Sequence, residues 1–165
     1  MLRTTGEQRP TPSEACSGWS TIPADGIWGG DCEYYAFVAD LTLPETFAGH
    51  PAELSLLTGC EGQWDATNPQ FSVYINGELR QGFDVNHHEL TLTECAKPGE
   101  CFSVFLSAYT GVQNFHLVFD ASLHTVDREI EGLYYDLLVP WQTACLLDQD
   151  DTPVSYTHLT LPTIA

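Results

Sequence analysis

Hydrophobic and polar residues alternate in short runs between residues 34 and 124, which is the pattern of β-strands with one buried face. We expect strands at 34–43, 53–58, 71–75, 78–83, 89–93, 101–109 and 114–124. One face of the sixth run carries Phe102, Val104, Leu106 and Ala108, and one face of the last carries Phe115, Leu117, Phe119, Ala121 and Leu123. Short strands separated by Gly and Pro turns predict a mainly β fold, an antiparallel β-sandwich or jelly roll.

The pair Asn76-Gly77 lies between two of these runs. Both central residues of a two-residue hairpin turn need a positive φ, which Asn and Gly adopt most readily. The sequence therefore predicts that 71–75 and 78–83 form a hairpin.

The hydrophobic period changes to that of a helix after residue 125. Asp127 is placed to cap this helix. The apolar residues that follow at helical spacing are Ile130, Leu133, Tyr134, Leu137 and Leu138. Pro140 is expected to break or kink the helix, which residues 141–147 then resume. Such a helix either connects the sandwich to a further domain or packs back on the sandwich.

Four segments of different character divide the chain. Residues 1–17 are expected to be a flexible leader, 18–125 a β-sandwich domain, and 126–152 a helical connector. Residues 153–165 differ, because 154–163 read VSYTHLTLPT. That peptide resembles the translation of a transposase adaptor used in sequencing libraries. We expect this tail to be non-native and the native chain to continue.

Acidic residues dominate the charge of the chain. It has 165 residues, of which five are Lys or Arg and 23 are Asp or Glu, giving a formal net charge of −18. This charge argues against a nucleic-acid partner and against binding to an anionic membrane surface. No run is long and apolar enough for a transmembrane helix, and no secretory signal is visible. We therefore expect a cytoplasmic protein.

The six cysteines show no spacing typical of a zinc site. They are Cys16, Cys32, Cys60, Cys95, Cys101 and Cys145. A disulfide between Cys95 and Cys101, across a turn at 97–99, is one option. Buried reduced thiols are the expectation for a cytosolic chain.

The richest polar segments are 64–70 and 84–89. Asp84 with His87 or His88 offers at most two or three metal ligands, too few to close a zinc site. The simpler interpretation is a loop held by Asp and Asn side chains that bond to local backbone groups. A third interpretation is a contact with another domain or subunit.

Three tryptophans could form a stacking platform for sugar rings. Trp19, Trp28 and Trp64 are the candidates. Burial in the core or in a loop anchor is the more ordinary role of such residues.

Several short segments resemble the N-terminal domain of bacterial family-38 α-mannosidases. They are Ile27-Trp28-Gly29-Gly30-Asp31, Phe37, Leu43-Pro44-Glu45, Gly62-Gln63-Trp64-Asp65-Ala66, Asn68-Pro69-Gln70-Phe71, Val73-Tyr74-Ile75-Asn76-Gly77 and Gln81-Gly82-Phe83-Asp84-Val85-Asn86-His87. Leu133-Tyr134-Tyr135-Asp136-Leu137 resembles the helix that leads toward that family's catalytic domain. The matching segments span about residues 19 to 147.

The resemblance implies a glycoside hydrolase that cleaves α-mannosides of oligosaccharides with retention, using zinc and an aspartate nucleophile. Those groups belong to a later domain, so no catalytic or metal-binding residue and no cofactor is assigned to this chain. The implied partners are the downstream catalytic domain of the same polypeptide, its carbohydrate substrate and other subunits of a homo-oligomer. The residues expected at an interdomain or subunit contact are Trp64, Asn68, Gln70, Asp84, Asn86 and His87.

Two functions are therefore carried forward. The first is a non-catalytic N-terminal domain of an exo-acting α-mannosidase, inactive by itself. The second is a stand-alone carbohydrate-binding or interaction module. Exposed apolar surface on the helix at 127–147 would favour the first, because monomers seldom expose large contiguous apolar patches.

Overall fold

A computed structural model of the protein describes residues 2–4, 11, 19–22, 26–58, 68–112 and 116–146. The chain divides into two compact units, Met1–Thr125 and Val126–Ala165. The division falls where the hydrophobic period of the sequence changes from that of strands to that of a helix. The first unit is mainly antiparallel β-structure and the second contains one helix, which confirms the expected fold class.

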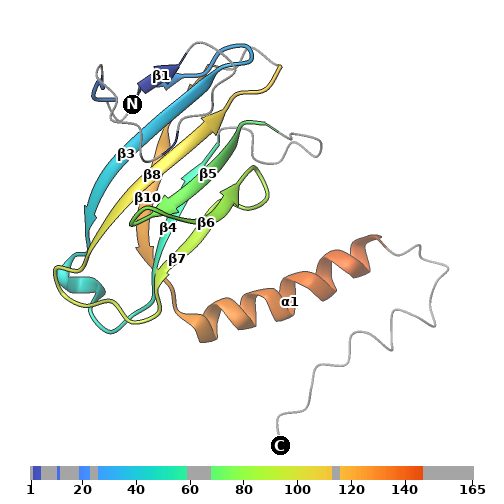
Figure 1. The fold of residues 1–165 in the computed structure, drawn as a ribbon. Coiled ribbons are helices and arrows are strands. Elements are labelled where there is room, and N and C mark those ends of the chain that lie inside the picture. Colours follow the sequence, from blue (N-terminus) through green and yellow to red (C-terminus); the bar gives the residue numbers. More distant parts are fainter. Residues whose placement is uncertain are drawn as a thin grey trace, which may run out of the picture. The chain divides into compact units, whose positions relative to one another are not determined.

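The first unit contains two main sheets (Figure 1), joined by the short 3-10 helix η1 (Glu45–Phe47) between β3 and β4. The five-stranded sheet has the order β1 (Leu2–Thr4), β3 (Tyr34–Thr42), β8 (Cys101–Tyr109), β5 (Gln70–Ile75) and β6 (Glu78–Phe83). The three-stranded sheet has the order β10 (Asp120–Thr125), β4 (Ala52–Leu57) and β7 (Glu89–Thr93). A small third pair joins β2 (Ile27–Trp28) to β9 (Leu117–Val118).

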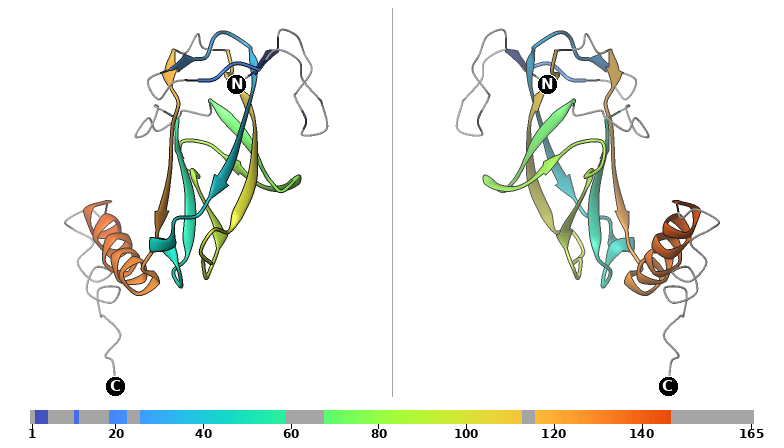
Figure 2. Two further views of the ribbon diagram at one scale, coloured as in Figure 1. Left: turned by 90° about the vertical axis from the view of Figure 1, so that its left-hand side faces the viewer. Right: turned by 90° about the vertical axis from the view of Figure 1, so that its right-hand side faces the viewer.

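The core lies between the two main sheets, which face each other as two layers in Figure 2. Alternate residues of each strand point inward, as a strand's period of two requires. Strand β8 contributes Phe102, Val104, Leu106 and Ala108, all buried as the sequence predicts. The opposite layer contributes Leu54, Leu56, Leu90 and Leu92. The alternation of the sequence thus identifies the buried face of these strands correctly.

Trp28 fills one end of this core. Its side chain is 3% exposed, and its ring packs against Tyr35, Phe37 and Phe71 at centroid distances of 5.4, 5.3 and 5.4 Å. A ring enclosed on these sides has no face left for a sugar. Trp28 is therefore a core residue and not part of a stacking platform.

The predicted hairpin between β5 and β6 is confirmed. Asn76 and Gly77 have φ values of 53° and 83°, so both occupy the left-handed region that this turn requires. The side chain of Asn76 also accepts a hydrogen bond from the backbone N–H of Ser103 at 2.9 Å. That bond ties the turn to the neighbouring strand β8.

The expected strand at 114–124 is divided in the structure. β9 pairs with β2, whereas β10 pairs with β4, and Phe119 stands between them. The division allows one segment to serve two sheets. Phe119 and Leu123 still pack against the core. Phe119 and Ala121 line an apolar cavity of about 180 Å³ together with residues of β3, β4 and β8. Phe115 lies outside the described residues.

The structure differs from two other expectations at the residues that it describes. The leader at 1–17 is not unstructured throughout, because Leu2–Thr4 pairs with β3 in register Leu2↔Ala36 to Thr4↔Tyr34. The backbone donors and acceptors of an edge strand can pair with such a segment whatever side chains the segment carries. The side-chain pattern of the sequence therefore does not reveal this pairing. The rest of the leader, apart from Thr11, lies outside the described residues.

The cysteines that the structure describes are exposed, not buried as expected. Cys32, Cys95, Cys101 and Cys145 all have free thiols, so the Cys95–Cys101 disulfide is not formed. The expected turn between Cys95 and Cys101 does exist. Gly99 has φ 72°, and the Glu100 N–H donates a hydrogen bond to the Lys97 carbonyl. Cys16 and Cys60 are outside the described residues.

Helix α1 (Arg128–Leu146) makes up the described part of unit 2. Asp127 caps it as expected, since its Oδ1 accepts hydrogen bonds from the N–H groups of Glu129 and Ile130 at 3.0 and 3.2 Å. The expected break at Pro140 is absent, because the helix continues through that residue. Among the described residues, no helix is both long and apolar enough to cross a membrane.

Candidate functional site

A hollow of about 380 Å³ lies on the five-stranded sheet. Its volume is in the lower part of the range of about 300–1,000 Å³ that is usual for small-molecule sites. The residues that line it are Tyr34, Gln70, Phe71, Ser72, Gly82, Phe83, Asp84, Ser107, Ala108 and Tyr109. They come from β3, β8, β5, β6 and the residue after β6, strands that Figure 1 shows side by side.

Strand register explains why the sheet is hollowed here. Phe71, Phe83 and Ala108 belong to the core, so their neighbours in sequence lie on the opposite face of the sheet. On that face one row across the strands consists of Tyr34, Tyr109 and Gln70.

The next row along the strands consists of Ala36, Ser107, Ser72 and Gly82. The row beyond it places Phe105 beside Tyr74, with ring centroids 5.7 Å apart. A row of small residues between two rows that carry aromatic rings leaves a depression with a polar floor.

The aromatic wall of the hollow is a pair of tyrosines. The rings of Tyr34 and Tyr109 have centroids 4.8 Å apart and planes tilted by 32°. A hydrogen bond with the Cys32 side chain is the main cause that raises the pKa of Tyr109. Tyr109 therefore remains a neutral phenol well above neutral pH, with an apolar ring face and a polar tip.

Asp84 supplies the negative charge of the site. Its Oδ1 accepts hydrogen bonds from the backbone N–H groups of Asn86 and His87, both at 2.8 Å, and lies 3.2 Å from the His87 ring Nδ1. Burial, the largest single influence, raises the pKa of Asp84, but these hydrogen bonds together lower it below the ordinary 3.8. Asp84 is thus an anchored carboxylate, and its Oδ2 has no partner among the residues that the structure describes.

Ser107 lies on the floor of the hollow with an unmatched hydroxyl. It is 4% exposed, and its Oγ makes no hydrogen bond within the described part of the chain. Leaving a buried hydroxyl unpaired costs about 1–3 kcal/mol, so such a group calls for an explanation.

The residues predicted at an interdomain or subunit contact lie in different places in the structure. Gln70 and Asp84 both line the hollow. Asn86 and His87 are exposed and form the turn that holds Asp84, which is the geometry expected of a loop held by Asp and Asn side chains. Asn68 is half-buried against Gly111, and Trp64 lies outside the described residues. Whether these residues form an interdomain contact stays a prediction.

Sequence reasoning missed the five other residues of the hollow that lie on the outer face of the sheet, which are Tyr34, Ser72, Gly82, Ser107 and Tyr109. Each belongs to a strand that was predicted, and alternation places each on the polar face. Their proximity depends on which strands pair and in what register. Alternation assigns each residue to a face of its strand but does not say which strands become neighbours.

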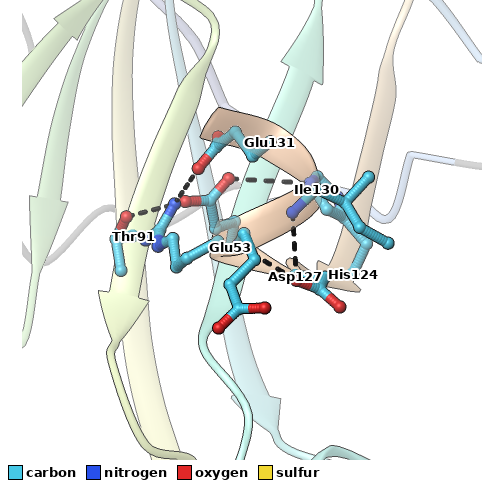
Figure 3. A network of polar contacts seen from close by, with 8 residues as sticks. Glu53, Thr91, His124, Asp127, Ile130 and Glu131 are labelled. Atoms are coloured by element: carbon cyan, nitrogen blue, oxygen red, sulfur yellow. Dashed lines mark hydrogen bonds and ion pairs between the residues drawn. The ribbon is translucent and has the colours of Figure 1, made fainter. Parts of the chain in front are cut away.

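A second polar cluster surrounds Glu53 on β4 (Figure 3). This carboxylate is only 5% exposed, and its Oε1 accepts a hydrogen bond from the Thr91 hydroxyl at 2.8 Å. Its Oε2 lies 3.7 Å from Nε2 of His124. The three residues pair across neighbouring strands, so both carboxylate oxygens are engaged within the sheet. We interpret this cluster as structural.

Metal ligation finds no support in the geometry. In the described ranges, no group of three or more His, Cys, Asp and Glu side chains is placed to hold an ion. His87 hydrogen bonds to Asp84, and His88 is half-buried with an unpaired Nδ1 within those same ranges.

The lowered pKa of Asp84 predicts a local acid transition. The ionised Asp84 carboxylate stabilises the folded state fully above pH 3.8, the ordinary pKa. This contribution to folding stability is lost as the pH falls through the lower pKa of the folded state. Replacing His87 by Ala removes the ring interaction and should raise the pKa of Asp84 toward 3.8. The ¹³C shift of the Asp84 carboxyl, followed by NMR from pH 6 to pH 2 (roughly the range in which carboxylates titrate), measures this. The exposed His116→Ala serves as the control, and an unchanged Asp84 titration in His87→Ala would contradict the assignment.

Comparisons with protein-family models, with curated proteins and with solved structures find no match for this chain.

Proposed function

We propose that this chain is a non-catalytic β-sandwich domain of a larger glycoside hydrolase, a retaining exo-α-mannosidase. In this proposal helix α1 leads into a downstream catalytic domain of the same polypeptide, and the zinc and the aspartate nucleophile belong to that domain. The family assignment is supported by the short segments that resemble family-38 α-mannosidases. The domain role is supported by the surface of α1.

The observation that carries the domain role is the exposed apolar stripe of α1. Ile130, Leu133, Leu137 and Trp141 follow one another at helical spacing and are 65, 59, 52 and 69% exposed. No described residue of this helix is buried. A helix that keeps such a stripe in water gains little from tertiary packing, which is the main source of helix stability in proteins.

A following domain is the occupant that fits this stripe best. The helix begins three residues after β10 and forms its own unit, which supports a connecting role. Leu133-Tyr134-Tyr135-Asp136-Leu137, the segment that resembles the family's connecting helix, includes two residues of the stripe. Burial against a catalytic domain would remove these side chains from water.

Recovering the longer gene tests the proposed function directly. The coding DNA beyond residue 152 is expected to specify a domain with paired His and Asp zinc ligands. The full polypeptide should hydrolyse an α-mannoside with retention at the anomeric carbon, followed by NMR, and lose this activity to a chelator. A native stop codon soon after residue 152, or a downstream domain without hydrolase activity, would refute it.

Hydrogen exchange tests the packing of α1 separately. In the 165-residue chain, amides of Arg128–Leu146 should exchange rapidly, because the helix lacks the tertiary packing that supplies most helix stability in proteins. In the full polypeptide the same amides should exchange at least about tenfold more slowly, as burial stabilises the helix. Substituting Leu133 and Leu137 by Asp should abolish this protection. Protection of equal size in both chains would show that a downstream domain does not cover α1.

A further inference from the structure

We propose that the hollow on the five-stranded sheet binds one neutral sugar unit, so that this domain contacts carbohydrate itself. The inference goes beyond the proposed function and does not depend on it, because the site is formed wholly by the sandwich. It rests on the aromatic wall, on the polar floor and on polar side chains that line the hollow and have unpaired atoms among the described residues.

The aromatic wall suits the apolar face of a sugar ring. Tyr34 and Tyr109 are both half-buried, so part of each ring remains accessible. Small-molecule sites combine such aromatic surface with a few fixed polar groups that set orientation. The wall and the floor of the hollow belong to adjacent rows of the same sheet, so a ring against the tyrosines would place its hydroxyls over the floor.

The polar groups match hydroxyls better than other ligand groups. Ser107 offers a hydroxyl and Gln70 an amide, each of which can both donate and accept hydrogen bonds, and neither makes one within the described residues. Asp84 offers Oδ2 as an acceptor only. Sugar hydroxyls donate and accept in turn, so they can satisfy all three groups.

Charge and hydrogen-bonding capacity argue against the alternatives. Asp84 is ionised and the chain carries a formal charge of −18, which disfavours phosphate and other anions. A cation could pair with Asp84 and contact the tyrosine rings, but it cannot accept a hydrogen bond from the Gln70 amide. A purely apolar ligand would leave the Ser107 hydroxyl unpaired.

Gly82 allows the hollow to be blocked without disturbing the core. A Cβ added at Gly82 would meet the Phe71 carbonyl oxygen at 3.6 Å, an ordinary contact, and Gly82 does not need a positive φ. Valine also favours strands more than glycine does. Gly82→Val should therefore keep or raise the stability of the sandwich while it fills the floor of the hollow.

The test is an NMR titration of the whole 165-residue chain with the methyl glycosides of mannose, glucose and galactose. At least one should bind in the millimolar range and shift the Tyr109 ring and Gln70 side-chain amide resonances. Gly82→Val should abolish these shifts. Asp84→Asn and Tyr109→Ala should each weaken binding by about tenfold or more, since they remove a charged acceptor and the ring.

Matched variants separate binding from folding. Tyr109→Phe keeps the ring and should retain most of the affinity, whereas Tyr135→Ala, an exposed tyrosine on α1, should leave it unchanged. The proposal is overturned if none of the three glycosides shifts these resonances. It is also overturned if Gly82→Val binds like the wild type, or if tetramethylammonium shifts the hollow and the glycosides do not. Each of these results would leave the proposed catalytic domain unaffected.

Discussion

Replacing Trp28 by Ala is expected to lower the free energy of unfolding of the sandwich by about 3–5 kcal/mol, the usual cost of truncating a buried tryptophan. The ring is 3% exposed and contacts Tyr35, Phe37 and Phe71, so its loss leaves a cavity lined by aromatic side chains. Domains of this size are stable by only about 5–15 kcal/mol, so the substitution removes between about a fifth and all of that stability. Urea unfolding followed by far-UV circular dichroism measures the change.

Trp141→Ala is the matched control for this experiment. Trp141 is 69% exposed on α1 and belongs to the second unit, so its loss should change the stability of the sandwich by less than about 0.5 kcal/mol. A cost below about 1 kcal/mol for Trp28→Ala would contradict the core assignment. That result would also reopen the sugar-platform interpretation of this tryptophan.

Gly111→Ala is expected to be the second severe change, at roughly 2–5 kcal/mol. Gly111 has φ 78°, a conformation that costs a residue with a Cβ about 1–2 kcal/mol. The added Cβ would also lie only 2.8 Å from Cβ and 2.6 Å from Nδ2 of Asn68. The Asn68 side chain, or the backbone at Gly111, must then shift, two residues before β5 begins at Gln70.

Gly49→Ala separates the two causes of this loss. Gly49 has nearly the same conformation, φ 83°, but an added Cβ would meet nothing within 4 Å. Its variant should therefore show only the backbone cost of about 1–2 kcal/mol. The difference between the two variants in urea unfolding measures the crowding at Asn68. Equal losses of unfolding free energy in the two variants would mean that Asn68 moves aside at no energetic cost.

The hollow shows why site prediction from this sequence was incomplete. Gln70 and Asp84 were singled out as polar residues at a contact, and both line the hollow. Tyr34 and Tyr109, which also line the hollow, were not predicted. They are 75 positions apart in the chain and meet only because β3 pairs with β8. The polar environment of Asp84 was visible locally, since its partners Asn86 and His87 follow it directly.

The sequence by itself determined what depends on near neighbours along the chain. Alternation identified the strands, Asn76-Gly77 marked the hairpin, and Asp127 marked the start of α1, because each signal acts within a few residues. The same local reasoning predicted a break or kink at Pro140, and the helix continues through that residue without a break. A helix can carry one missing hydrogen bond when the residues on both sides keep their helical conformation.

Only the tertiary structure decided which segments meet. It paired Leu2–Thr4 with β3, divided 114–124 between two sheets, and enclosed Trp28 among aromatic rings. It also set the register that places small residues between aromatic rows and so forms the hollow. These outcomes depend on contacts between residues far apart in sequence, and the pattern along each strand does not say which other strand it will pair with.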